Sequence, residues 1–280
     1  MQKFLLLLTT VGILSFSGCK RENITPNPTP TRDAALTLGN PSNAVANATN
    51  MTNYLMEKAT YALSYNNERG GPNWVAWHLS SAWKGSTARQ DDFRKDPALP
   101  SNFYAVGHSD YTNTGFDRGH QCPSDDRDST VEDNSSTFLM TNMLPQAPNA
   151  NRITWVNLED YCRALMQQGK ELYIYCGGYG AGGNGSNGNL TTFAGGKVTV
   201  PKRLWKIIVV LPIGAEDAKR VAEDTRVIAV DMPNVQSVNS KSWQEYRVSV
   251  RDLETATGYN FLSNVPQKIQ EVIEKKIDSE

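Results

Sequence analysis

The sequence lacks the features that would place it in several common classes. Its 28 basic and 29 acidic side chains leave a formal net charge of −1, whereas a protein dedicated to nucleic-acid binding is usually basic. A polyanionic partner must therefore bind to a local basic patch, because the net charge of the chain does not attract it. No internal repeat of about 20 to 50 residues is visible, which excludes solenoid architectures. The hydrophobic content of 39 % is typical of a soluble domain with its own core.

Long hydrophobic runs are also missing. The most apolar stretch, residues 4–14, is too short to span a bilayer of about 30 Å as a helix. Lys3 precedes it and small residues follow, so we expect residues 1–19 to be a signal peptide. The ending FSGC resembles a bacterial lipobox, which implies cleavage before Cys19 and lipid on its sulfur. The alternative is an ordinary secretory signal with a chance cysteine. The lipobox predicts an exported protein anchored to the bacterial outer membrane, on its periplasmic face or at the cell surface.

The domain boundaries follow from composition. Residues 20–34 carry three prolines and no apolar periodicity, which indicates a flexible tether. No linker interrupts residues 35–275, so we expect one domain there and a short C-terminal tail at 276–280. The oligomeric state is not determined by any pattern in the sequence.

Cysteine and histidine are both scarce. With Cys19 lipidated, Cys122, Cys162 and Cys176 allow at most one disulfide, and the sequence does not choose the pair. His108 and His120 lie twelve residues apart, and Cys122 lies two residues after His120, but no second pair with the spacing of zinc ligands follows. The third histidine, in the aromatic strand VAWHL, is most simply a packed or edge residue.

Apolar patterning predicts the secondary structure. Strands are expected near residues 61–65 and at 74–79, 171–178, 197–201, 204–213 and 226–233, and helices at 155–169, 215–225 and 266–277. The helix at 155–169 carries an apolar stripe at i, i+3 and i+7 spacing. Strands and helices do not alternate regularly, so the prediction is an α+β fold with a mixed, largely antiparallel central sheet flanked by helices. The glycine-rich run 177–189 has GxGxxG spacing, but no helix follows it, which favours a hairpin loop.

The stretch FDRGHQCPSDDR places His120 in a polar segment. Gly119 before it permits a backbone turn that other residues avoid. Further along, Glu159 and Arg163 are i, i+4 neighbours and share a helix face, while Asn151 lies eight residues earlier, roughly 80° away if helical. An amide, a carboxylate and a guanidinium can therefore converge on one side of this helix, away from the apolar stripe. An exposed, salt-bridged helix face is the alternative.

Several ordered motifs together resemble one family. DRGH at 117–120, TNMLPQ at 141–146 and N-x3-W-x2-LE at 151–159 resemble the sugar-non-specific DNA/RNA endonucleases, the ββα-metal nucleases. RQDDFRKDPAL at 89–99 is similar to an arginine-bearing segment of that family, and the likeness extends over most of the domain. The resemblance implies a ββα-metal active-site motif within the α+β fold and a Mg²⁺ cofactor, with Mn²⁺ as a substitute.

The resemblance also implies a role for each matching residue. It makes His120 the general base, Asn151 the direct metal ligand and Glu159 the carboxylate that holds the waters of the ion. Arginines near the phosphate correspond to Arg118, Arg163 and an upstream arginine, which is Arg89 or Arg94.

The chemistry of these residue types is consistent with phosphodiester hydrolysis. A neutral imidazole with a pKa near about 6.5 accepts a proton from water at physiological pH. Mg²⁺ prefers oxygen ligands and keeps several waters, and arginines bind phosphate oxygens in pairs of hydrogen bonds. None of these contacts reads a base edge, so DNA and RNA are both expected as substrates, with little sequence specificity. The sequence does not decide a preference between them. The rival is a non-catalytic, nucleic-acid-binding surface lipoprotein on a nuclease scaffold, against which the presence of His120, Asn151 and Glu159 together argues.

Overall fold

The computed structural model describes residues 28–280. The expected signal peptide at 1–19, the lipidation site Cys19 and the first part of the tether lie outside these residues. No helix in the described part of the chain is long and apolar enough to cross a membrane.

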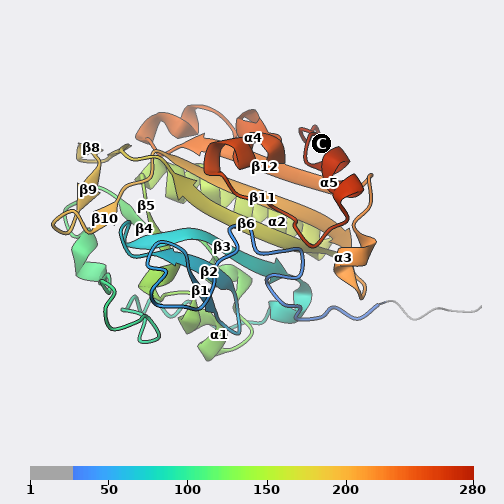
Figure 1. Ribbon diagram of the computed structural model, residues 1–280, viewed down its shortest axis with the longest axis horizontal. Coiled ribbons are helices and arrows are strands. Elements are labelled where there is room, and N and C mark those ends of the chain that lie inside the picture. The colour runs from blue at the N-terminus through green and yellow to red at the C-terminus, as the bar shows by residue number, and fades with distance from the viewer. Residues whose placement is uncertain (1–27) are drawn as a thin grey trace, which may run out of the picture.

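A seven-stranded sheet runs through the centre of the described chain (Figure 1), in the order β1-β2-β3-β6-β11-β12-β13. The strands are β1 Tyr54–Glu57, β2 Ala62–Asn66, β3 Gly71–Leu79, β6 Lys170–Tyr179, β11 Arg203–Pro212, β12 Arg226–Pro233 and β13 Arg247–Val248. All neighbouring strands are antiparallel, which confirms the predicted sheet. The middle strands are apolar almost throughout because both of their faces are covered.

Three short antiparallel ribbons stand outside this sheet. They pair β4 Asp117–His120 with β5 Met143–Gln146, β7 Gly183–Gly185 with β8 Gly188–Leu190, and β9 Thr192–Phe193 with β10 Val198–Thr199. The β7–β8 pair is formed by the glycine-rich run, with Gly188 at its turn in the left-handed region at φ +97°. The run is therefore a hairpin, as predicted, and no helix opens there.

The helices are short, except for one. They are α1 Val131–Ser136, α2 Val156–Gln167, α3 Asp217–Arg220, α4 Val250–Thr257 and α5 Gln267–Ile273. A π-helical segment, Ala150–Trp155, leads directly into α2. Single 3-10 turns occupy Ser81–Trp83, His108–Tyr111, Ser124–Asp126, Met140–Asn142, Gln236–Ser240 and Trp243–Tyr246. The helix expected over residues 215–225 is limited to the four residues of α3.

The sheet separates two hydrophobic cores. On one face, Trp77 and Ile174 belong to the core that receives the apolar stripe of α2, including Trp155 and Leu158. On the other face, Trp205 and its neighbours pack with residues of α4 and α5, which lie over the sheet in orange and red (Figure 1). Successive side chains of a strand point to opposite faces, so β3, β6 and β11 contribute to both cores. The predicted amphipathic helix is confirmed as α2.

The N-terminal segment is attached to the domain earlier than the sequence suggested. The Ser80 hydroxyl donates to the carbonyl of Thr31 at 2.5 Å, and the backbone N–H of Asp33 donates to His78 Nδ1 at 3.3 Å. The flexible tether predicted to reach residue 34 therefore ends before Thr31, because these contacts fix its last residues against β3.

The C-terminal end is also held. Asp278 accepts hydrogen bonds from Arg226 at 2.7 Å and from Arg247 at 3.0 Å. These two ion pairs join the expected tail, residues 276–280, to strands β12 and β13.

Candidate active site

The DRGH motif is a strand. Residues 117–120 form β4, and His120 pairs with Met143 of β5. Gly119 has no positive φ, so the turn expected at this glycine is absent. A Cβ at Gly119 would lie 2.3 Å from the side chain of Gln146, which is buried against it. Glycine is therefore required here because β4 and the Gln146 side chain approach closely. The ribbon β4–β5 followed by α2 forms the predicted ββα arrangement.

One cavity gathers the candidate catalytic and metal-binding residues, apart from Arg94. Its volume is about 360 Å³, and its lining includes Arg89, Arg118, His120, Asn151, Glu159 and Arg163. Residues from the segment before β4, from β4 itself, from the π-helix and from α2 thus meet at one place. Arg94 does not line the cavity, because its guanidinium is bound to Asp92 at 2.7 Å and to the carbonyl of Ser135 at 2.9 Å. A second cavity of about 320 Å³ shares four residues with the first, Arg89, Arg118, Asn151 and Arg152.

His120 lies between two aromatic rings and two cations. Its ring centroid is 5.4 Å from that of Phe93 and 4.8 Å from that of Phe138. Its Nε2 atom is buried and has no hydrogen-bond partner among residues 28–280. Burial and then the positive charges of Arg89 and Arg118 lower the pKa of His120 to about 3. The imidazole is therefore neutral over the whole physiological range.

The two arginines are held by the same aromatic pair. The Arg118 guanidinium lies 4.2 Å from the centre of the Phe93 ring, and that of Arg89 lies 4.7 Å from the centre of Phe138. Arg89 also donates to the hydroxyl of Ser124 at 2.8 Å. Stacking holds the flat face of a guanidinium and leaves its edge free for hydrogen bonds. The arrangement suits an anion bound between the two arginines, next to His120.

Asn151 is held by an acidic residue of β4. Its Nδ2 donates to Asp117 Oδ2 at 2.9 Å, and Arg152 binds both oxygens of Asp117 at 2.8 and 2.7 Å. The amide oxygen Oδ1 accepts no hydrogen bond from the described residues and is available to a ligand. Asn151 belongs to the π-helix, so the angle of about 80° to Glu159 predicted for a regular helix does not apply.

Glu159 is buried, with 8 % of its surface exposed. The polar helix face expected at this position is instead turned toward the protein. Burial raises the pKa of Glu159 to about 7, against the opposing charge of Lys206. Lys206 Nζ lies 3.5 Å from Glu159 Oε1 and 4.2 Å from the centre of the Trp155 ring.

The sequence interpretation missed Lys206. It projects from β11 toward α2 and is 1 % exposed. The sequence does contain a feature that indicates its role, the single lysine within the apolar run LWKIIVV. A charged side chain on a buried strand requires a buried partner.

Arg163 is bound to two aspartates. It donates to Asp126 at 3.1 Å and to Asp160 at 2.6 Å. Glu159, its expected i, i+4 partner, is paired with Lys206 instead. Asp126 also accepts from Trp77 Nε1 at 2.9 Å, so Arg163 is tied through it to the central sheet.

Two further kinds of residue lie close to the site. Arg127, the last residue of the stretch FDRGHQCPSDDR, is buried and donates to the carbonyls of Thr60 and His78. It therefore supports the fold and adds no surface charge. Cys122, Cys162 and Cys176 are all buried and free, so the described chain contains no disulfide.

Comparisons with known proteins agree with this geometry. The family model of the DNA/RNA non-specific endonucleases matches residues 38–268. A nuclease of Nostoc sp. is 52 % identical over 250 residues, which cover 89 % of this chain and 88 % of that protein. Nuclease C1 of Cunninghamella echinulata is 30 % identical over 84 % of this chain and 90 % of its own length.

A solved structure shows the same fold. The complex of EndoG with EndoGI matches with a TM-score of 0.68 and 23 % identity, over 84 % of this chain and 92 % of that one. The ribbon-and-helix geometry, the extent of the family match and the identity to full-length nucleases lead to one assignment. The chain is an enzyme of the DNA/RNA non-specific endonuclease family.

Proposed function

We propose that this nuclease uses His120 as its general base and a Mg²⁺ ion held by Asn151 to hydrolyse internal phosphodiester bonds. The observation that carries the proposal is the cavity lined by His120, Asn151, Glu159 and four arginines. A general base must lie within hydrogen-bond reach of the attacking water, and this cavity has room for water beside the imidazole.

His120 acts as a proton acceptor at a nitrogen of its imidazole. Its low pKa keeps the ring neutral, but a pKa of about 3 also makes it a weak base. A phosphate between Arg89 and Arg118 offsets the two positive charges that help to lower the pKa. Substrate binding therefore raises the basicity of His120 at the moment when a proton has to be taken from water.

The residues fit a magnesium ion. Asn151 Oδ1 has no other partner among the described residues, and Asp117 fixes the orientation of the amide. The carboxylate of Glu159 would hold waters of the ion, and Lys206 favours its charged form. Mg²⁺ binds oxygen and retains several waters, so one protein ligand is sufficient, and Mn²⁺ could replace it. When bound, the ion would supply stabilisation of negative charge on phosphoryl and leaving oxygens.

The substrates are DNA and RNA. The candidate groups are cations and a metal ligand, which suit phosphate oxygens, and phosphate contacts carry no sequence information. The test is digestion of a plasmid and of an RNA by residues 20–280, with Mg²⁺ and with a chelator. Cleavage of both substrates that stops with the chelator is expected. Activity unaffected by the chelator would contradict the metal assignment.

The location of the enzyme is a separate proposal. The FSGC ending implies that lipid on Cys19 anchors the exported enzyme to the outer membrane. Two or more acyl chains provide stable anchoring, whereas one chain provides marginal binding. Metabolic labelling with a fatty-acid probe should tag the wild type and leave Cys19→Ser unlabelled, and equal labelling of both would refute the anchor.

A further inference from the structure

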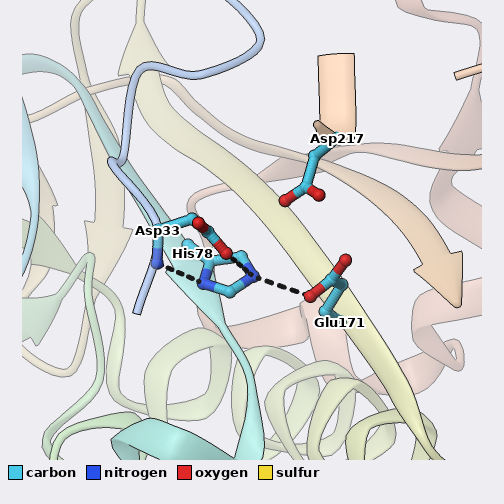
Figure 2. A group of neighbouring side chains, drawn as sticks. All are labelled: Asp33, His78, Glu171 and Asp217. Atoms are coloured by element: carbon cyan, nitrogen blue, oxygen red, sulfur yellow. Dashed lines mark hydrogen bonds and ion pairs between the residues drawn. The ribbon is translucent and has the colours of Figure 1, made fainter. Parts of the chain in front are cut away.

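A cluster of four side chains lies away from the catalytic cavity. Figure 2 shows Asp33 of the N-terminal segment, His78 of β3, Glu171 of β6 and Asp217 at the start of α3. His78 of β3 lies opposite Tyr173 of the neighbouring strand β6, so the two side chains are on the same face of the sheet. Tyr173 belongs to the core on the side of α4 and α5. The cluster therefore occupies the face of the sheet opposite α2.

The ligand atoms of the cluster converge. One nitrogen or oxygen from each of the four side chains lies within 4.8 Å of the others. His78 Nε2 is 3.6 Å from Glu171 Oε2 and 3.9 Å from Asp33 Oδ2. These distances exceed those of hydrogen bonds, which are about 2.7 to 3.2 Å. They approach the roughly 3.3 to 3.6 Å between two ligands that each lie about 2.0 to 2.2 Å from one tetrahedral ion.

Two of these atoms are buried without a partner. His78 is 1 % exposed and Glu171 is 0 % exposed. His78 Nε2 and Glu171 Oε2 face each other (Figure 2), and neither makes a hydrogen bond to any residue in 28–280. A buried polar atom without a partner is unfavourable, and such atoms in native proteins commonly indicate a missing water or ion.

Neighbouring side chains hold the carboxylates from outside. Arg220 donates to one oxygen of Glu171 and, at 2.6 Å, to one oxygen of Asp217. The Tyr173 hydroxyl donates to the other oxygen of Asp217. Support of this kind fixes the orientation of metal ligands in many proteins. Three carboxylates against one guanidinium leave two net negative charges when His78 is neutral, which a divalent cation would neutralise.

We propose that Asp33, His78, Glu171 and Asp217 form a structural site for a divalent transition-metal ion of the zinc type, separate from the catalytic cavity. An imidazole combined with carboxylates favours such an ion over Mg²⁺ or Ca²⁺, which prefer all-oxygen sites. Because Asp33 belongs to the N-terminal segment, the ion clamps this segment onto the sheet. In the metal-free protein, Nδ1 of His78 accepts the N–H of Asp33, so the neutral imidazole carries its proton on Nε2. When the ion binds Nε2, this proton moves to Nδ1, and the Asp33 carboxylate on the ion takes the place of the Asp33 N–H hydrogen bond.

The test uses the full-length chain in detergent, stripped of metal and titrated with Zn²⁺ by calorimetry and thermal melting. At about 100 times Kd, Zn²⁺ should raise the Tm of the wild type by about 5 to 10 °C. Asp33→Asn preserves shape at a half-exposed position, and it should weaken this Zn²⁺ binding at least tenfold. Asn151→Ala removes the proposed catalytic ligand, and it should retain the Zn²⁺-dependent rise, which separates this site from the proposed catalytic one. Equal affinity and equal Tm shifts in wild type and Asp33→Asn would overturn the proposal.

Two readouts do not depend on the folding of a variant. Trypsin cleavage after Arg32, next to Asp33, should become at least tenfold slower in the wild type when Zn²⁺ is added. Crystals of the wild type grown with Zn²⁺ should show an anomalous peak between His78 and Glu171. Absence of this peak would overturn the proposal.

Discussion

His120 and His78 are the same side chain in opposite electrostatic environments. His120 faces Arg89 and Arg118, and its nearest rings are those of Phe93 and Phe138. His78 instead faces the carboxylates of the cluster on the other side of the sheet. Cationic neighbours exclude a proton and attract an anion, whereas carboxylate neighbours attract a cation.

The chemistry open to a histidine is therefore decided by the charges around it and by its position in the fold. Both rings have a buried Nε2 without a hydrogen-bond partner among residues 28–280. His120 stands on a two-stranded ribbon that borders a cavity, and His78 stands on a central strand with Glu171 on the adjacent one. Loss of activity and loss of stability should therefore separate between substitutions at these two histidines.

The largest effect is expected for the two alanine variants. His120→Ala should lose about 10²- to 10⁴-fold in cleavage rate, because a positioned base contributes that much. Its free energy of unfolding at pH 7.5 should change by only about 1 kcal/mol. His78→Ala should keep most of its activity per folded molecule and lose about 2 kcal/mol of stability, since a buried side chain is removed. Nuclease assays and chemical denaturation of both variants measure the two effects. Near-wild-type cleavage by folded His120→Ala would exclude His120 as the base.

The metal ligand should give the next largest effect. Asn151→Ala should raise the Mg²⁺ concentration needed for half-maximal activity by about 10- to 100-fold, the range seen when the support of a metal site is lost. The control is Asn157→Ala, an exposed asparagine on α2 that does not line the cavity. A magnesium titration of activity compares the two. The same requirement in both variants would place the ion elsewhere.

The low pKa of His120 predicts a pH-dependent loss of stability. The unfolded ring binds a proton below its ordinary pKa of about 6.5, and the folded ring does so only near about 3. Stability is therefore full above pH 6.5 and decreases as the pH falls toward 3. At pH 5 the linked loss amounts to about 2 kcal/mol. Denaturation of wild type and His120→Asn at pH 5 and pH 7.5 should show this loss in the wild type only. Parallel pH dependence in both would contradict the assigned environment.

The raised pKa of Glu159 predicts that metal binding depends on pH. The carboxyl group has a pKa of about 7 and is protonated in the metal-free protein at lower pH. An ion must displace this proton, so the apparent Mg²⁺ affinity should fall about tenfold from pH 8 to pH 6. Glu159→Gln should have a weaker affinity that varies less between these two pH values. Magnesium titrations at both pH values provide the measurement, and an unchanged slope in Glu159→Gln would assign the proton to another group.

Local patterns were sufficient for much of the fold. The apolar runs predicted β6, β11 and β12, and the spacing of Trp155, Leu158 and Cys162 predicted α2. Local patterns could not reveal that Gly119 makes room for Gln146, since this contact depends on the register of β4 against β5.

The site was predictable only in part. The family resemblance identified several of the residues that line the cavity. The structure places Arg89, and not Arg94, in the lining. The contact between Lys206 and Glu159 was missed, because Lys206 lies on β11, 47 residues after Glu159 in the sequence. The same limit applied to His78, whose carboxylate neighbours come from three distant segments.

The docking of Thr31 and Asp33 onto β3 limits how far from the membrane a lipid-anchored enzyme could act. If Cys19 carries the lipid, the link between membrane and body comprises residues 20–30, and its contour length is at most about 40 Å. Such a link is close in length to the diameter of the domain, so the active site would stay within roughly two domain diameters of the bilayer. Degradation would then be confined to a thin layer along the membrane, and the fragments would be released where they are produced.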